Sequence, residues 1–213
     1  MYLVKTPWWL KALYPQLTWQ MPPSTTNTLY LTFDDGPHPT ATPFVLQTLQ
    51  QYQAKATFFC IGNNVVQHPQ VYHQMVQQGH SIGNHTHNHL NGWHTQNQAY
   101  CRNVYQAAQY LPTTLFRPPY GRIKRQQAKQ LLHPANHLQP QFANIVMWDV
   151  LSGDFDTQLS PQHCALNVVR HATNGSIIVF HDSTKAWSRL SYALPYVLEH
   201  FSALGYAFKS IPQ

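Results

Sequence analysis

The sequence predicts an α/β fold in which about seven parallel strands, with helices between them, form an irregular (β/α) barrel. Short apolar runs alternate with longer segments of helical periodicity, as in repeated β-α units. The chain has 213 residues, of which 43% are hydrophobic, enough for the core of one domain. Periodicity alone also allows an open, doubly wound sheet, and both arrangements place reactive side chains at the carboxyl ends of the strands.

Seven apolar runs bounded by turn residues are the expected strands. They are residues 29–33, 56–60, 81–84, 115–117, 144–148, 176–180 and 206–211. Between them, Pro43, Pro69 and Pro161 are each expected at the first position of a helix, where the missing proline N–H costs nothing. The expected helix C-termini are marked by Gly79, Gly175 and Gly205.

The first 27 residues differ in character from the rest. Trp8, Trp9 and Leu10 are apolar, but Pro7 and Pro15 interrupt the segment, which has no long apolar core and no small-residue cleavage site. We therefore expect no cleavable signal peptide, and divide the chain into an N-terminal arm packed on the domain (residues 1–27) and the domain itself (residues 28–213). The alternative for the arm is peripheral contact with a membrane or the cell envelope. No stretch approaches the length of a transmembrane segment.

The net charge of +6 would suit nucleic acid, but the longest basic cluster is Arg122, Lys124 and Arg125. No nucleic-acid-binding motif accompanies it, so we expect no nucleic-acid partner. The three cysteines, at positions 60, 101 and 164, match neither a metal knuckle nor a disulfide framework. We expect buried thiols, a pattern that favours the cytoplasm. The oligomeric state is not indicated.

Polar side chains collect where the expected strands end. Because such ends meet at one edge of a parallel sheet, we expect these residues to converge. They are Asp34, Asp35, His85, His89, Arg117, Asp154, His181 and Asp182.

The histidines at 85, 87 and 89 leave two interpretations open. Spacing of four would place His85 and His89 on one side of a helical turn, which suits zinc, whereas an extended segment would place all three on one face. In a chain with 14 histidines, chance clustering is the alternative. Likewise, Asp34 and Asp35 before Gly36 could serve two chemical roles or form an Asx turn.

Two histidines and one carboxylate would leave coordination positions open for water and substrate, as in catalytic zinc sites. A Lewis acid with activated water indicates hydrolysis. Such a reaction also needs a base and an acid, and Asp34 and His181 suit these roles.

Five motifs resemble those of the polysaccharide deacetylases with a NodB-homology domain, carbohydrate esterase family 4. They are Thr-Phe-Asp-Asp-Gly-Pro (residues 32–37), Asn-His-Thr-His-Asn-His (84–89), Arg-Pro-Pro-Tyr-Gly (117–121), Trp-Asp-Val-Leu-Ser-Gly-Asp-Phe (148–155) and Ile-Val-Phe-His-Asp-Ser (178–183). They occur in the family order, and the resemblance runs from about Leu29 to the C-terminus. Residues 28–213 would then be the catalytic domain.

The resemblance implies a role for each of these residues. Asp34 would be the general base, and Asp35, His85 and His89 would bind a divalent metal, most commonly zinc, with cobalt, manganese or nickel as alternatives. His181 would be the acid.

Further roles follow from the same resemblance. Arg117 would keep Asp34 ionised and oriented, and the Tyr120 N–H would stabilise the oxyanion. Phe155, Val179 and Pro119 would contact substrate. Asp154 would tune His181, although Asp149 is a second candidate for that role.

Three positions depart from the pattern of the family. Leu151 stands where the family commonly has aspartate, Phe155 where it has tryptophan, and Val179 where it has leucine. The fourth motif is therefore the weakest match.

The expected partner is an acetylated glycan. The implied function is metal-dependent removal of N-acetyl groups from polysaccharide containing N-acetylglucosamine, such as peptidoglycan or chitin oligomers. The alternatives are an O-acetyl esterase acting on xylan-type glycans and a glycan-binding relative without activity. Trp93, Tyr120 and Trp187 could stack on sugar rings or pack in the domain.

Overall fold

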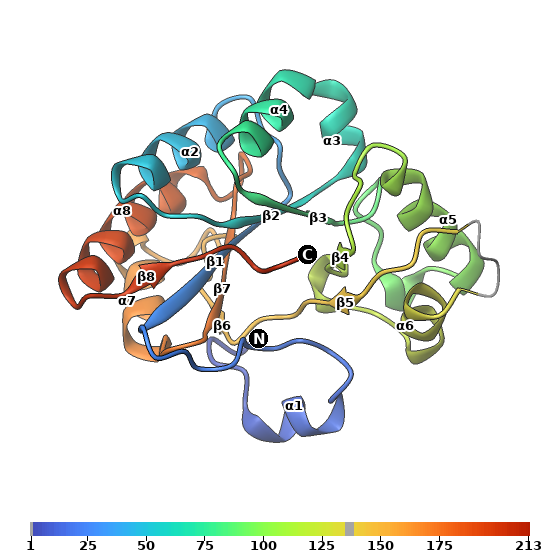
Figure 1. Ribbon diagram of the computed structural model, residues 1–213, viewed down its shortest axis with the longest axis horizontal. Helices are drawn as coiled ribbons and strands as arrows, with labels where there is room; N and C mark the ends of the chain where they lie inside the picture. The colour runs from blue at the N-terminus through green and yellow to red at the C-terminus, as the bar shows by residue number, and fades with distance from the viewer. Residues whose placement is uncertain (1, 135–138) are drawn as a thin grey trace.

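The computed structural model describes residues 2–134 and 139–213. Its strands surround the middle of the molecule, and helices α2 to α8 cover them from outside (Figure 1). The strands are β1 (Thr28–Asp34), β2 (Thr57–Cys60), β3 (Ser81–Asn84), β4 (Leu115–Phe116), β5 (Asn144–Ile145), β6 (Val150–Leu151), β7 (Ile177–His181) and β8 (Ala207–Phe208). The α-helices are α1 (Trp8–Leu13), α2 (Ala41–Gln51), α3 (Gly62–Gln67), α4 (Pro69–Gln77), α5 (Asn97–Ala108), α6 (Arg125–Leu132), α7 (Pro161–His171) and α8 (Trp187–Ala203).

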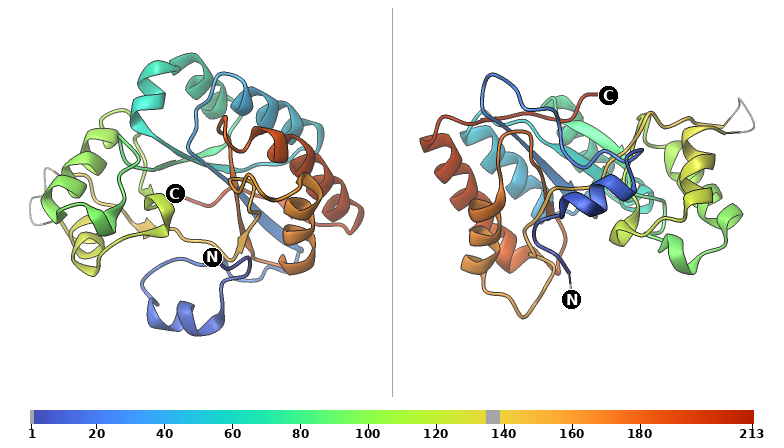
Figure 2. Two further views of the ribbon diagram at one scale, coloured as in Figure 1. Left: turned by 180° about the vertical axis from the view of Figure 1, so that it is seen from behind. Right: turned by 90° about the horizontal axis from the view of Figure 1, so that it is seen from below.

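The sheet confirms the predicted α/β class. Seven strands follow the order β5-β4-β3-β2-β1-β7-β6, and the short β8 pairs with β1. Each of these pairings is parallel, and the seven strands form a curled half-barrel, as the two views of Figure 2 show. The strands expected at 144–148 and 206–211 are shorter than predicted, and β6 was missed because only two residues pair there.

Alternation along β1 explains how one strand serves both the core and the site. Every residue of β1 is buried. Leu29, Leu31 and Phe33 pack toward the helices, whereas Tyr30 belongs to a separate cluster that fills the inside of the half-barrel. Because side chains alternate between the two faces of a strand, Asp34 shares the inner face with Tyr30.

The proline and glycine signals are confirmed in part. Pro69 and Pro161 begin α4 and α7, but Pro43 is the third residue of α2, which begins at Ala41. Gly79 and Gly205 follow the ends of α4 and α8 with positive φ. Gly175 does not end a helix: α7 stops at His171, and Gly175 lies in the turn before β7.

The N-terminal arm lies along the open side of the half-barrel, between β5 and β6 (Figure 1). Lys5 forms an isolated β-bridge with Val150, the first residue of β6, and Thr18 forms one with Val146, just after β5. The arm therefore pairs with the backbone at both edges of the half-barrel. Trp19 is buried with the side chains of α5 and α6. The short helix α1 carries the exposed Trp8.

Asp149 fixes the arm to the domain. Its side chain is 1% exposed and lies 2.6 Å from the ammonium groups of both Lys5 and Lys11. Lys5 also donates to the carbonyl of His171. Burial alone would raise the pKa of Asp149, but hydrogen bonds from the two lysines and from Ser176 lower it.

The three cysteines, at positions 60, 101 and 164, are free and buried, as predicted. Of the helices in residues 2–134 and 139–213, none has the combined length and apolar character needed to cross a membrane.

Candidate active site

The carboxyl ends of four strands bring the expected site residues together. Asp34 and His181 end β1 and β7 and are register partners, which places their backbones about 5 Å apart. His85 and Arg117 follow directly after β3 and β4, and Asn84 pairs with Phe116 between these strands. Residues far apart in sequence thus meet at one edge of the sheet, as predicted.

Arg117 is fully buried and holds Asp34. Its Nη1 donates to Asp34 Oδ1 and to Thr32 Oγ1, each at 2.7 Å. Nε and Nη2 donate to the carbonyls of Val146 and Met147. The guanidinium therefore has an acceptor for each of its nitrogens, which a buried cation needs.

Asp35, His85 and His89 form a group that could hold a metal ion, because their ligand atoms lie within 4.8 Å of one another. His89 Nε2 is 3.1 Å and His85 Nε2 3.7 Å from Asp35 Oδ1. This oxygen is buried, yet none of the described residues gives it a hydrogen bond of good geometry. A buried carboxylate oxygen facing two imidazole nitrogens fits a divalent metal.

The second nitrogen of His85 fixes its tautomer. His85 Nδ1 lies 2.7 Å from the carbonyl oxygen of Arg117, which can only accept, so Nδ1 carries the proton and Nε2 is free to coordinate. Burial lowers the pKa of His85 to about 4 despite the carboxylates of Asp34 and Asp35. The ring is therefore neutral at pH 7, as a metal ligand must be.

The histidine loop is neither helical nor extended, so the pairing of His85 with His89 holds although the helical turn expected to produce it is absent. Thr86 and His89 have positive φ values of 66° and 56°, which turn successive side chains away from any regular face. The His87 side chain lies outside this group and stacks on the Tyr110 ring, with ring centroids 6.0 Å apart. The structure therefore brings together His85 and His89 without His87.

Left-handed backbone concentrates at this site. Of the five non-glycine residues with positive φ among those described, four are Asp35, Thr86, His89 and Tyr120. Such residues are strained and persist only where their surroundings hold them. Asn64 contributes here, because its Nδ2 donates to the carbonyl of Asp35 at 2.7 Å.

Asp154, not Asp149, contacts His181. Asp154 is fully buried and accepts from His181 Nδ1 and from its backbone N–H, both at 2.8 Å. Burial alone would lower the pKa of His181, but the Asp154 carboxylate, together with the charges of Asp35 and Asp34, raises it to about 9. His181 is therefore charged at pH 7, with Nε2 available to donate.

The other expected site residues lie around this centre. Tyr120 is 60% exposed, and its ring lies 4.6 Å from that of His89. Among the described residues no acceptor pairs with the Tyr120 N–H. Phe155 packs edge-on against His181 at 5.3 Å. Val179 and Pro119 are both buried, Val179 on the same strand face as His181.

Asp182 has a structural role that the sequence analysis did not assign. It is fully buried, accepts from the Gly36 N–H at 3.0 Å and from the Thr42 hydroxyl, and thereby fixes the turn after Asp35. A Cβ on Gly36 would come within 2.1 Å of the Asp182 carboxylate, so only glycine fits there. Burial raises the pKa of Asp182 to about 8.

Comparisons with known proteins agree with this arrangement. Residues 22–134 match the family model described as polysaccharide deacetylase. A peptidoglycan-N-acetylglucosamine deacetylase of Bacillus cereus is 32% identical over 203 residues, covering 92% of each chain. A chitooligosaccharide deacetylase of Azorhizobium caulinodans is 31% identical over 206 residues, covering 87% of this chain and 93% of its own.

Two solved structures share the fold. A peptidoglycan N-acetylglucosamine deacetylase superposes with a TM-score of 0.82 at 26% identity, over 97% of this chain and 95% of its own. A family pseudoenzyme from Bacillus anthracis superposes with a TM-score of 0.73 at 21% identity, over 91% of this chain and 66% of its own. Because a pseudoenzyme has the same fold, the fold alone does not decide activity.

The geometry predicts which histidine binds metal. His89→Gln should weaken zinc binding by more than about 100-fold, since even changes outside the ligand set cost up to about that much. The matched variant His87→Gln should bind zinc as the wild type does. Isothermal titration of metal-free protein with zinc measures both. Equal losses in the two variants would show that the ligand set is wrong.

Proposed function

The chain belongs to the polysaccharide deacetylase family, and we propose that it hydrolyses the N-acetyl group of N-acetylglucosamine residues in a polysaccharide such as peptidoglycan or a chitin oligomer. The observation that carries the proposal is the juxtaposition of a base and an acid, Asp34 and His181, on neighbouring strands beside the Asp35-His85-His89 group. The relatives named for peptidoglycan and for chitooligosaccharides support the substrate class.

A metal held by Asp35, His85 and His89 would polarise the acetyl carbonyl and promote ionisation of a water molecule. Zinc suits the donor set best, because two imidazoles and one carboxylate leave coordination positions open. His85 is already neutral and oriented for this role through the Arg117 carbonyl.

Asp34 accepts a proton from the water as it attacks the acetyl carbon. The ion pair with Arg117 keeps the carboxylate in one orientation, so it loses little freedom in the transition state. The N–H of Tyr120 donates to the oxyanion that forms, because a preorganised donor stabilises developing charge.

His181 then completes the reaction. Its Nε2 donates a proton to the sugar nitrogen, the C–N bond breaks, and acetate leaves with a free amine on the sugar. An amine leaves poorly unless it is protonated, so the charged state of His181, maintained by Asp154, is the state needed. Phe155 beside His181 supplies an apolar wall for the acetyl methyl group.

Acetate release tests the proposal directly. Zinc-loaded protein should release acetate from N-acetylglucosamine oligomers or peptidoglycan, and Asp34→Asn should lower kcat by about 100-fold or more because the base is lost. Glu199→Gln removes a carboxylate from the exposed face of α8 and should leave the rate unchanged. Absence of acetate from both substrates would contradict the proposal, and acetylated xylan would then test the O-acetyl esterase alternative.

The pH dependence tests the role of His181. The acid must be protonated, so the basic limb of the activity profile should fall as the pH rises through about 9. Asp154→Asn removes the largest influence that raises this pKa, so the basic limb of the kcat profile should move to lower pH, toward about 6.5.

Asp156→Asn is the matched control for this profile, because Asp156 lies two residues away and its carboxylate accepts from the Tyr2 hydroxyl and the backbone N–H of Gln158, not from His181. Its profile should follow that of the wild type. An unmoved basic limb in Asp154→Asn would exclude His181 as the acid that the profile reports.

A further inference from the structure

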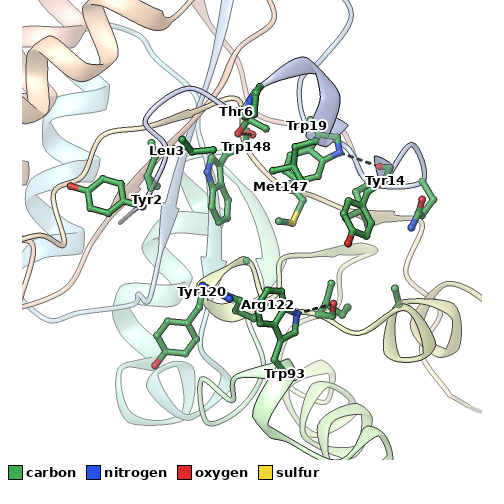
Figure 3. A pocket seen from close by; sticks show the side chains of 18 of the residues that line it. Tyr2, Leu3, Thr6, Tyr14, Trp19, Trp93, Tyr120, Arg122, Met147 and Trp148 are labelled. Carbon is green, nitrogen blue, oxygen red and sulfur yellow. Dashed lines mark hydrogen bonds between the residues drawn. The ribbon is translucent and has the colours of Figure 1, made fainter. Parts of the chain in front are cut away.

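A pocket of about 420 Å³ lies between the N-terminal arm and the segment that follows the Arg-Pro-Pro-Tyr-Gly motif. Tyr14 and Trp19 of the arm stand on one side of it, and Trp93, Tyr120 and Arg122 stand on the other (Figure 3). This volume falls within the range of about 300–1,000 Å³ typical of small-molecule sites. Of the residues that line it, the reaction described above uses the backbone N–H of Tyr120.

The pocket adjoins the active site at two points. Tyr120 lines the pocket and lies against the metal-site residue His89, with ring centroids 4.6 Å apart. Tyr2 also lines it and packs at 5.0 Å against Phe155, which contacts the acid His181. A chain of sugars with one residue at the reacting centre could therefore place a neighbouring residue in the pocket.

The lining of the pocket contains basic side chains and no acidic one. Arg122 and Arg125 are exposed there, and neither forms an ion pair with any residue in the described part of the chain. The Cζ atom of Arg122 lies over the Trp93 ring, 4.0 Å from its centroid. This contact orients the guanidinium but leaves its charge without an anionic partner.

No acidic side chain of the described residues lines the pocket. The chain has only seven Asp and Glu residues. Asp149 pairs with both arm lysines, Lys5 and Lys11, and Asp156, which accepts from Tyr2, does not line the pocket. Among the described residues, the basic side chains that line the pocket without an anionic partner are therefore Arg122, Lys124 and Arg125. The Lys124 ammonium donates to the carbonyl of Thr95, whereas Arg122 and Arg125 are exposed.

We propose that the arm pocket binds a sugar residue that carries a carboxylate, next to the N-acetylglucosamine residue whose acetyl group is removed. The proposal rests on the proposed function and deepens it: the chain would select glycan strands with acidic substituents over neutral chitin-type oligomers. Tyr120 and Trp93, which are 60% and 52% exposed, offer aromatic surface to the sugar ring. Arg122 and Arg125 offer planar, paired donors that match a carboxylate.

A matched pair of substrates tests this directly. The first is a peptidoglycan tetrasaccharide with free carboxylates, and the second is the same molecule with these groups converted to primary amides. Zinc-loaded wild type should favour the acid over the amide by about tenfold in kcat/KM. Exposed charge pairs each contribute modestly, so Arg122→Gln and Arg125→Gln should each lower this preference by about threefold, and the double variant should nearly abolish it.

Arg102→Gln is the control, because it removes an exposed arginine from α5 that does not line the pocket. It should keep the full preference. Added salt should weaken the preference of the wild type, since exposed charges are screened. Quenching of tryptophan fluorescence on titration with each oligosaccharide gives binding of the same pair without turnover.

The outcomes separate this proposal from the proposed function. Deacetylation of both substrates at equal kcat/KM would overturn the arm-pocket proposal and leave the deacetylase function standing. If Arg102→Gln lowered the preference for the acid as much as Arg122→Gln and Arg125→Gln do, the preference would come from the net charge of the protein. This result would also overturn the arm-pocket proposal. If neither substrate releases acetate and N-acetylglucosamine oligomers release none either, the proposed function fails. The fluorescence titration alone then decides the pocket: equal affinities for the acid and the amide would overturn the arm-pocket proposal.

Discussion

The buried guanidinium of Arg117 is the constraint on which the rest of the site depends. A cation with no exposed surface must find acceptors in several directions, and here they come from β1, through Thr32 and Asp34, and from the carbonyls of Val146 and Met147 beyond β5. The ring of Phe59 packs against its face at 4.1 Å. The main-chain carbonyl of Arg117 accepts a hydrogen bond from His85 Nδ1 and so orients that imidazole. One residue thus aligns the proposed base through its side chain and a proposed metal ligand through its carbonyl.

Neighbouring carboxylates acquire different tasks through their surroundings. Asp34 lies within a strand and faces Arg117, whereas Asp35, with φ of 79°, turns toward the histidines. Asp149 and Asp154 also have different partners: Asp149 binds the arm lysines, and Asp154 binds His181. In a chain with few acidic residues, each buried carboxylate has a distinct partner, and that partner decides what the group does.

Much of the fold could be predicted from the sequence because β1, β2 and β7 are mostly apolar runs between clear breaks. The two-residue strand β6 could not be predicted, since its pairing depends on neighbours brought in by the rest of the chain. The convergence of polar residues at strand ends followed from topology alone. Topology did not predict that His87 lies outside the candidate metal site, because its position depends on left-handed backbone at Thr86 and His89. The part that Asp149 plays could not be read either, because its lysine partners lie about 140 residues earlier.

Arg117 positions the proposed base with its side chain and the proposed metal site with its main chain. The most direct test measures zinc content and acetate release on one sample of Arg117→Lys with wild-type circular dichroism. A lysine cannot reproduce the planar donors of arginine, so acetate release should fall by about 100-fold, as small misplacements of catalytic groups do, while one zinc per chain is retained. Acetate release close to that of the wild type, or loss of zinc together with activity, would contradict this account.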